Sequence, residues 1–279
     1  MTKPPLRICL SGVTGGVGRA LLPAIVAEPD LELVGAVARS AAGRDAGEAI
    51  GQPATGVTVV TDVEDAFRSG VDVLIDYSVY EVTKENLAKA IAHKVPVVLG
   101  TTGFSASELE ALDAPARQAG IGIVTGNFSL TAALLQHFAL FAARHLDHFE
   151  VIDTCKPTKP DAPSGTAREL AEKLAEVKRP KLEVPIGEIH GEPAARGATV
   201  EGVQCHSLRL PGFASRVEAI FGTGTERLKL CHEAITHGEP FVKGSLLAAR
   251  KLAEPGETRI TGVVRGLDTL LFAGGNGLG

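Results

Sequence analysis

A glycine-rich turn near the N-terminus constrains the fold of this 279-residue chain more than any other feature. A short apolar run at 6–10 leads into Gly12, Gly15 and Gly18, and a helical pattern follows at 17–27. Gly12 permits a tight turn, Gly15 lets the backbone approach a pyrophosphate, and Gly18 allows close packing of helix on strand. The helix N-terminus adds free N–H groups and a positive dipole end. We therefore expect a dinucleotide at this turn; the alternative is a plain tight turn.

The first 127 residues alternate between short apolar runs and helical patterns. After 6–10, strands are predicted at 31–38, 57–60, 71–76, 95–99 and 121–124, with helices at 63–69, 81–93 and 105–119. This alternation predicts an α/β fold with a Rossmann-type, doubly wound parallel sheet.

The pattern changes beyond residue 127. We predict a helix at 130–146, a strand at 150–155, a loop rich in Pro and Lys at 156–163 and a helix at 167–177. A long surface loop at 180–200, antiparallel strands at 203–209, 216–221 and 227–232, and a helix at 241–252 complete the chain. We expect residues 1–127 plus 241–279 to form the dinucleotide-binding domain. Residues 128–240 are expected to form a second, α+β domain.

Candidate cofactor contacts lie in the glycine turn and at the ends of other predicted strands, where ligands bind in this architecture. Phe128 is expected to pack on the nicotinamide, and Thr101 and Thr102 to bind its carboxamide. The full candidate set is Gly12, Thr14, Gly15, Gly16, Val17, Gly18, Arg39, Ser40, Tyr77, Ser78, Gly100, Thr101, Thr102, Asn127 and Phe128.

The end of the second predicted strand carries Arg39 and Ser40 but no acidic residue. An acidic residue there would bind the ribose 2′-OH of NAD, whereas an arginine suits the 2′-phosphate of NADPH. NADPH is therefore the preferred cofactor and NADH remains possible. The alternative for Arg39 is a solvated surface side chain.

The segment DTCKPTKPDAPSGTAREL runs from a predicted strand into a helix. The backbone N–H groups of Ser164, Gly165 and Thr166 form a good cradle for a carboxylate, and Lys156 and Lys159 supply positive charge. Helix capping by Ser164, and by the neighbouring Asp161, is the competing interpretation, as is plain solvation for the two lysines.

Composition excludes several other classes of protein. The net charge of −5 argues against a nucleic-acid partner, and no apolar run is long enough for a membrane span. The four cysteines lie far apart, which argues against a disulfide framework or a metal site. The N-terminus lacks a signal-peptide pattern, so we expect a cytoplasmic protein.

The chain resembles the dihydrodipicolinate reductase family over nearly its whole length. The resemblance is carried by the glycine turn, GTTGF at 100–104, NFS at 127–129, KPDAPSGTA at 159–167, HSLRLPG at 206–212, ERLKLCHEA at 226–234 and FVKGSLLAARKL at 241–252. It implies NAD(P)H-dependent reduction of a CH=CH or C=N group in a cyclic imine dicarboxylate of lysine biosynthesis. It also implies a second domain that binds substrate and builds a homotetramer.

Several positions depart from the family pattern. Cys155 stands where the family has its proton-donating histidine, and Lys156 stands where it has a second, substrate-contacting histidine. A family arginine that contacts the distal carboxylate falls near His237. Gly16 replaces the usual basic residue of the turn, and Arg39 replaces the usual acid.

The candidate catalytic residues are therefore Lys159, Cys155 and Lys156. The candidate substrate contacts are Lys156, Lys159, Ser164, Gly165, Thr166 and His237. A thiol can donate a proton, but neighbouring lysines would favour its thiolate; either lysine is an alternative donor. Three alternatives to the family reaction stay open: reduction of a different imine carboxylate, a catalytically silent paralogue that binds NADPH, and an oxidative amino-acid dehydrogenase.

Overall fold

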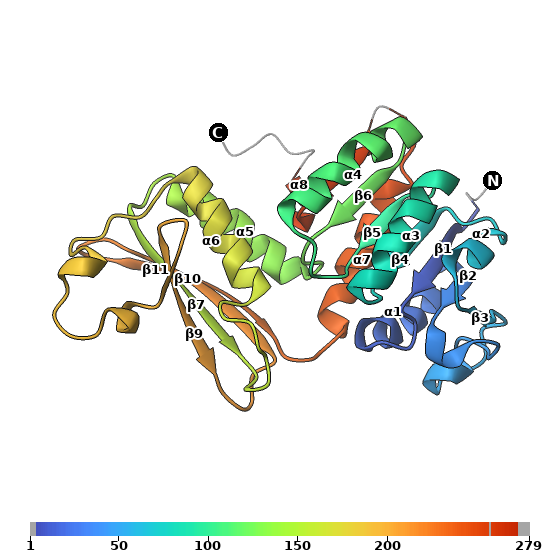
Figure 1. Cartoon of the computed structure of the whole chain (residues 1–279), viewed down its shortest axis with the longest axis horizontal. Helices are drawn as coiled ribbons and strands as arrows, with labels where there is room; N and C mark the ends of the chain where they lie inside the picture. Colours follow the sequence, from blue (N-terminus) through green and yellow to red (C-terminus); the bar gives the residue numbers. More distant parts are fainter. Residues whose placement is uncertain (1–3, 257, 273–279) are drawn as a thin grey trace. The chain divides into compact units, whose positions relative to one another are not determined.

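The computed structural model describes residues 4–256 and 258–272 and divides into two compact units. Unit 1 comprises Met1–Leu130 and His237–Gly279, and unit 2 comprises Thr131–Thr236 (Figure 1). The chain thus leaves unit 1, builds unit 2 without interruption, and then returns to complete unit 1.

Unit 1 is built on a seven-stranded parallel sheet with the order β12-β6-β5-β4-β1-β2-β3. Its strands are short and rich in Val, Ile and Leu, as expected when both faces of a sheet are covered by helices. The strands are β1 (Leu6–Ser11), β2 (Leu31–Val37), β3 (Val59–Val60), β4 (Val73–Asp76), β5 (Val97–Leu99), β6 (Gly122–Thr125) and β12 (Gly262–Arg265).

Helices pack on both faces of this sheet (Figure 1). One face carries α1 (Gly16–Ala27) and α7 (Glu239–Leu252), and the other carries α2 (Val63–Phe67), α3 (Tyr80–His93) and α4 (Ala106–Ala119). The short helices η1 (Arg39–Ala41), η2 (Glu48–Ile50) and α8 (Leu267–Phe272) complete the unit. The structure confirms the expected Rossmann-type fold.

The register of the parallel strands aligns their carboxyl ends at one edge of the sheet. Ser11 is paired with both Val37 and Asp76, Asp76 with Leu99, and Leu99 with Thr125. The loops that follow these four neighbouring strands and β2 therefore start from a common edge. All predicted cofactor contacts belong to these loops or to the start of α1.

Unit 2 is a five-stranded mixed sheet with the order β11-β10-β7-β9-β8. The strands are β7 (His148–Cys155), β8 (Ala198–Val200), β9 (Val203–Arg209), β10 (Ser215–Gly222) and β11 (Arg227–Ala234). Helices α5 (Leu130–Ala143) and α6 (Gly165–Val177) bury one face of the sheet against alternate residues such as Phe149, Val151 and Phe221. We call the opposite side, which carries Glu150, Ile152 and Ile220, the open face.

Three details differ from the sequence predictions. Strands β9 and β10 are not neighbours, because β7 lies between them and pairs parallel to β9. The segment at 180–200 is not wholly irregular, since it holds η3 (Ile186–Glu188), η4 (Pro193–Arg196) and β8. Strand β12 and helix α8 were not predicted, because a four-residue strand that begins with glycine gives a weak periodic signal.

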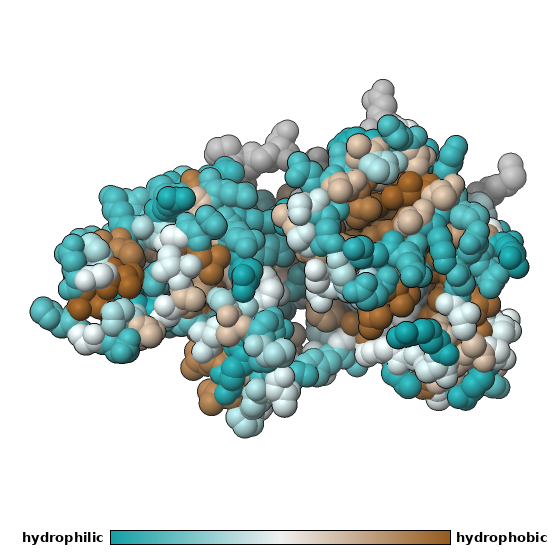
Figure 2. Space-filling model, in the orientation of Figure 1, coloured by the Kyte–Doolittle hydropathy of each residue, from teal (hydrophilic) through white to brown (hydrophobic). Residues whose placement is uncertain are grey.

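The surface of each unit is mainly hydrophilic on the visible face, with small hydrophobic patches between the polar residues (Figure 2). Within residues 4–256 and 258–272, every helix is too short or too polar to cross a bilayer. Exposed large hydrophobic side chains of unit 2 include Leu208 of β9 and the adjacent Leu210.

Candidate active site

The glycine turn between β1 and α1 is closed by backbone contacts that leave no room for side chains. Gly12 has a φ of +81°, and a Cβ there would lie 2.5 Å from the carbonyl oxygen of Tyr77. A Cβ on Gly18 would lie 2.1 Å from the carbonyl oxygen of Gly12, and one on Gly15 would lie 3.1 Å from the same atom. Only glycine fits at Gly12 and Gly18, so α1 approaches the turn as closely as a backbone can.

The start of α1 is open toward solvent. Gly15 is the N-cap and supplies no side-chain cap, the first turn carries no acidic residue, and Gly15 and Gly16 are exposed. A Cβ at Gly16 would meet nothing within 4 Å. The first N–H groups and the positive dipole end of α1 thus face solvent beside the glycine turn, an arrangement suited to binding a pyrophosphate.

Arg39 and Ser40 follow β2 beside this cradle. The Ser40 hydroxyl lies 3.2 Å from the hydroxyl of Thr14, which joins the end of β2 to the glycine turn. Arg39 is exposed, and among the described residues its guanidinium has no hydrogen-bond or ion-pair partner. A planar cation that is free and held next to the turn suits a phosphate.

The phenol of Tyr77, which follows β4, is buried in the interior of unit 1. Its hydroxyl lies 2.8 Å from the Ser245 hydroxyl of α7, and burial raises the pKa of the phenol. Gly100, after β5, lies against the tyrosine ring, since a Cβ there would come within 2.1 Å of a ring carbon. These two residues pack against each other at neighbouring strand ends.

The other predicted nicotinamide contacts differ in what they expose. Thr101 donates its hydroxyl to the Ser78 carbonyl at 3.0 Å, whereas Thr102 is exposed. The Asn127 side chain accepts a hydrogen bond from the Ser129 N–H at 2.9 Å. Phe128 is 1% exposed. This burial corrects the prediction that the Phe128 ring packs on the nicotinamide, because the ring fills the interior instead.

His237 lies in unit 1, next to the glycine turn. It is exposed and directly precedes Gly238, where a Cβ would lie 2.5 Å from the carbonyl oxygen of Gly16. This histidine was predicted to contact substrate. Its position in unit 1 brings it beside the predicted pyrophosphate cradle.

The second part of the candidate site is the loop from β7 to α6 in unit 2, and a buried carboxylate organises it. Asp153 accepts hydrogen bonds from the Ser164 N–H at 2.9 Å, from the Ser207 hydroxyl at 3.2 Å and from Arg209 at 2.9 Å. Burial alone would raise the pKa of Asp153, but these hydrogen bonds outweigh it and hold the pKa below its ordinary value. The charged carboxylate thereby fixes the start of α6 against the end of β7.

Cys155 takes part in the same buried cluster. Its side chain has no exposed surface, and its thiol donates to Asp153 at 3.3 Å. Burial and the Asp153 carboxylate raise the pKa of the thiol. One expectation is corrected here, since the neighbouring lysines do not favour a thiolate. The burial of Cys155 also argues against its candidate role as proton donor.

The N-terminus of α6 lies where the sequence predicts an anion cradle. Ser164 is buried and caps the helix through a hydrogen bond from the Ala167 N–H at 3.4 Å. Gly165 is exposed and has open space where a Cβ would be, and Thr166 is half-buried beside it. Ser164 is therefore the cap, and Gly165 and Thr166 form the accessible part of the cradle.

The two lysines of the loop differ in their partners. The Lys159 ammonium lies 2.8 Å from the Asp161 carboxylate, and Lys159 is half-buried. Lys156 is exposed and, within the described part of the chain, its ammonium has no partner. Both positive charges lie in the loop that precedes the cradle.

Sequence reasoning missed Asp153 and Arg209, which hold the loop in place. Asp153 lies between Val151 and Cys155 in the series of alternate β7 residues that point to the helix-covered face. A carboxylate at an inward position of a strand must find a partner, so the pattern itself was a usable signal.

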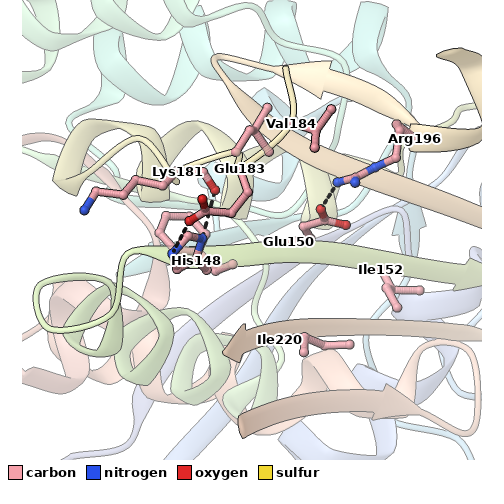
Figure 3. Close-up of a pocket in the computed structure, with 10 residues that line it drawn as sticks. His148, Glu150, Ile152, Lys181, Glu183, Val184, Arg196 and Ile220 are labelled. Carbon is pink, nitrogen blue, oxygen red and sulfur yellow. Dashed lines mark hydrogen bonds and ion pairs between the residues drawn. The ribbon is translucent and has the colours of Figure 1, made fainter. Parts of the chain in front are cut away.

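A pocket of about 420 Å³ lies elsewhere, on the open face of unit 2. Figure 3 shows Arg196 directed at Glu150 and His148 beside Glu183, with Ile152 on the floor. Its charged side chains all have partners, since Lys181 pairs with Asp147 just outside the pocket. Among the described residues, the pocket therefore has no counterpart to the exposed Lys156 of the β7–α6 loop.

Models of known protein families match both the N-terminal and the C-terminal part of the chain. Residues 6–128 match the family model for the dihydrodipicolinate reductase N-terminus, and residues 131–268 match that for the C-terminus.

Full-length relatives carry the same name. The chain is 37% identical over 276 residues to the 4-hydroxy-tetrahydrodipicolinate reductase of Synechococcus elongatus, covering 96% of this chain and 99% of the relative. It is 38% identical over 270 residues to that of Moorella thermoacetica, covering 95% and 98%.

Among solved structures, the dipicolinate-bound dihydrodipicolinate reductase of Paenisporosarcina sp. TG-14 matches with a TM-score of 0.80 and 28% identity. The match covers 95% of this chain and 99% of that one. A diaminopimelate dehydrogenase of C. glutamicum matches with a TM-score of 0.56 at 14% identity, covering 95% and 94%, which shows a shared fold alone.

Proposed function

Because the chain belongs to the dihydrodipicolinate reductase family, we propose that unit 1 holds the nicotinamide cofactor and that unit 2 holds the substrate. The protein is an NAD(P)H-dependent oxidoreductase that reduces a C=N or C=C bond in a cyclic imine dicarboxylate, the 4-hydroxy-tetrahydrodipicolinate reductase reaction of lysine biosynthesis. The assignment of the substrate to unit 2 rests on the accessible helix start at Gly165 and Thr166, which Lys156 and Lys159 precede in the loop.

The residues of unit 1 fit a dinucleotide. The cradle at Gly12, Gly15 and Gly18 would hold the pyrophosphate against the N-terminus of α1, because Gly12 and Gly18 have no room for side chains, Gly15 is exposed and the helix start is uncapped. When bound, the cofactor supplies a hydride. We assign NADPH as the preferred form, because the Arg39 guanidinium has no partner in the described part of the chain and the neighbouring Ser40 contacts Thr14 of the turn.

The residues of unit 2 bind and orient the substrate. One carboxylate would accept hydrogen bonds from the Gly165 N–H and from Thr166, and the Lys159 ammonium would balance its charge. Lys156 is exposed and has no partner among residues 4–256 and 258–272, so it is the better candidate for delivering the proton that balances hydride addition. The buried Cys155 supports the loop through Asp153 instead.

We also propose that the protein assembles into a homotetramer through the open face of the unit 2 sheet. That face carries Ile152 and Ile220 on neighbouring strands, and Leu208 of β9 is exposed there. Apolar side chains on an uncovered sheet favour burial against another copy.

The function is tested by following NADPH oxidation with freshly generated 4-hydroxy-tetrahydrodipicolinate. We expect turnover by the wild-type chain and a rise in KM of at least about tenfold in Lys159→Ala, since one charge-assisted contact is lost. Lys173→Ala is the matched control, because it removes a lysine roughly two turns along α6 from the cradle. Absence of turnover by wild-type protein that binds NADPH would reject the assigned reaction, and unchanged kinetics in Lys159→Ala would reject the assigned residue.

A further inference from the structure

Asp161 places a carboxylate of the chain itself at the cradle. Its Oδ1 lies 2.8 Å from the ammonium of Lys159, the residue that we assign to the substrate carboxylate. The backbone of Asp161 is anchored, because its carbonyl oxygen accepts a hydrogen bond from Arg209. The side chain is 45% exposed, so it can rotate into solvent while the loop stays in place.

The Asp161 carboxylate also faces the helix N-terminus. Burial alone would raise the pKa of this carboxyl, but Lys159 and backbone N–H groups, including that of Gly165, outweigh burial and hold the pKa below its ordinary value. The group is therefore charged at neutral pH. It pairs directly with one of the three donors that the proposed function assigns to the substrate, the Lys159 ammonium, and lies near a second, the Gly165 N–H.

We propose that Asp161 is an internal carboxylate that occupies the cradle of the ligand-free chain and is displaced when a substrate carboxylate binds. This inference rests on the proposed function, which places the substrate at Lys159 and Gly165. Two carboxylates cannot share these donors without repulsion, so binding requires an exchange.

The exchange has a consequence for selectivity. A tethered carboxylate has a high effective concentration at the cradle, so it excludes dilute free anions such as sulfate. A ligand that also gains contacts elsewhere in the site can displace it. Asp161 thus acts as a specificity-determining residue that disfavours simple anions relative to the substrate.

Calorimetric titration of the NADPH-loaded protein with dipicolinate tests the inference directly. Asp161→Asn keeps the side-chain shape but removes the charge, so we expect dipicolinate to bind roughly three- to fivefold more tightly, the upper part of the range for a partly exposed ion pair. Sulfate should also become a stronger competitor. The control is Glu176→Gln, which removes an exposed acid about 16 Å along α6, beyond the screening length, and should change neither quantity by more than about twofold.

Equal or weaker dipicolinate binding by Asp161→Asn, with a melting temperature like that of the wild type, overturns the inference. Unchanged competition by sulfate does so as well, because a merely structural residue would leave it unaltered. If Asp161→Asn does not fold, Asp161→Ser takes its place under the same criteria. Failure of the wild-type protein to bind dipicolinate overturns the proposed substrate site itself, and the inference with it.

Discussion

Replacing Gly18 by alanine tests whether close packing of α1 on the glycine turn creates the cofactor cradle. The added Cβ would lie 2.1 Å from the Gly12 carbonyl oxygen and 2.8 Å from the Cα of Val13. Ordinary contact begins at 3.4 Å, so the helix start must move by about 1.3 Å relative to the turn. Both neighbours are backbone atoms, so no side chain can rotate away to absorb the strain.

The expected cost has two parts. Overpacking of this kind lowers the free energy of unfolding by about 1–3 kcal/mol. A displacement near 1 Å also misplaces the N–H groups that meet the pyrophosphate, so we expect the dissociation constant of NADPH to rise by tenfold to about a hundredfold.

Gly16→Ala is the matched control, two residues away in the same turn of helix. A Cβ there meets nothing within 4 Å, so NADPH affinity should stay within about threefold of the wild type. Unfolding should become up to about 1 kcal/mol less favourable, because alanine is the better helix former. NADPH fluorescence titration and thermal unfolding measure both quantities. Equal NADPH affinity in Gly18→Ala and Gly16→Ala would refute the reasoning.

Three further substitutions test other parts of the site. Arg39→Glu should raise the KM for NADPH at least about tenfold and change the KM for NADH little, because the 2′-phosphate of NADPH would meet a like charge. Steady-state kinetics with both cofactors measure this, and an unchanged preference for NADPH contradicts the assignment. Cys155→Ala should keep kcat/KM within about threefold, because the thiol is fully buried; a loss of a hundredfold would restore it as the proton donor. Asp153→Asn should lower the free energy of unfolding at pH 7 by about 3 kcal/mol, because it breaks a buried ion pair with Arg209. The folded-state pKa of Asp153 is lowered, so its stabilisation is present above the unfolded pKa near 3.9 and is lost as pH falls through the folded pKa. Urea unfolding should therefore show the difference shrinking below about pH 4, and a difference that persists at pH 2 would argue against a charged Asp153.

Much of unit 1 was predictable from the sequence because its signals are local. The glycines at 12, 15 and 18 mark the turn, and the apolar runs that follow alternate with helical patterns at the spacing of a parallel sheet. Strand β12 escaped prediction because it pairs with β6 from far along the chain, and four residues carry too little periodicity. The neighbours of β9 escaped for a related reason, since spatial order in a mixed sheet is decided by long-range pairing.

The candidate site was predictable in composition but not in detail. Spacing placed Gly165 and Thr166 at a helix start, which the structure bears out. It did not distinguish inward from outward side chains at the end of β7, so Cys155 was considered as a proton donor although it is buried against Asp153. The ring of Phe128 was misplaced likewise, because burial depends on packing against distant segments.

The discontinuous make-up of unit 1 sets an order of events during synthesis. Strand β6 ends at Thr125 and its partner β12 begins at Gly262, 137 residues later, which at 5–20 residues per second is a delay of roughly 7–27 s on the ribosome. Throughout that interval the hydrogen-bonding edge of β6 is bare, and a bare edge is a template for pairing with another nascent chain. Unit 2 is contiguous and is available in full before β12 emerges. Unit 1, which is synthesised first, is thus completed last, when β12 pairs with the edge of β6 and the Val263 N–H donates a hydrogen bond to the Asp113 carboxylate.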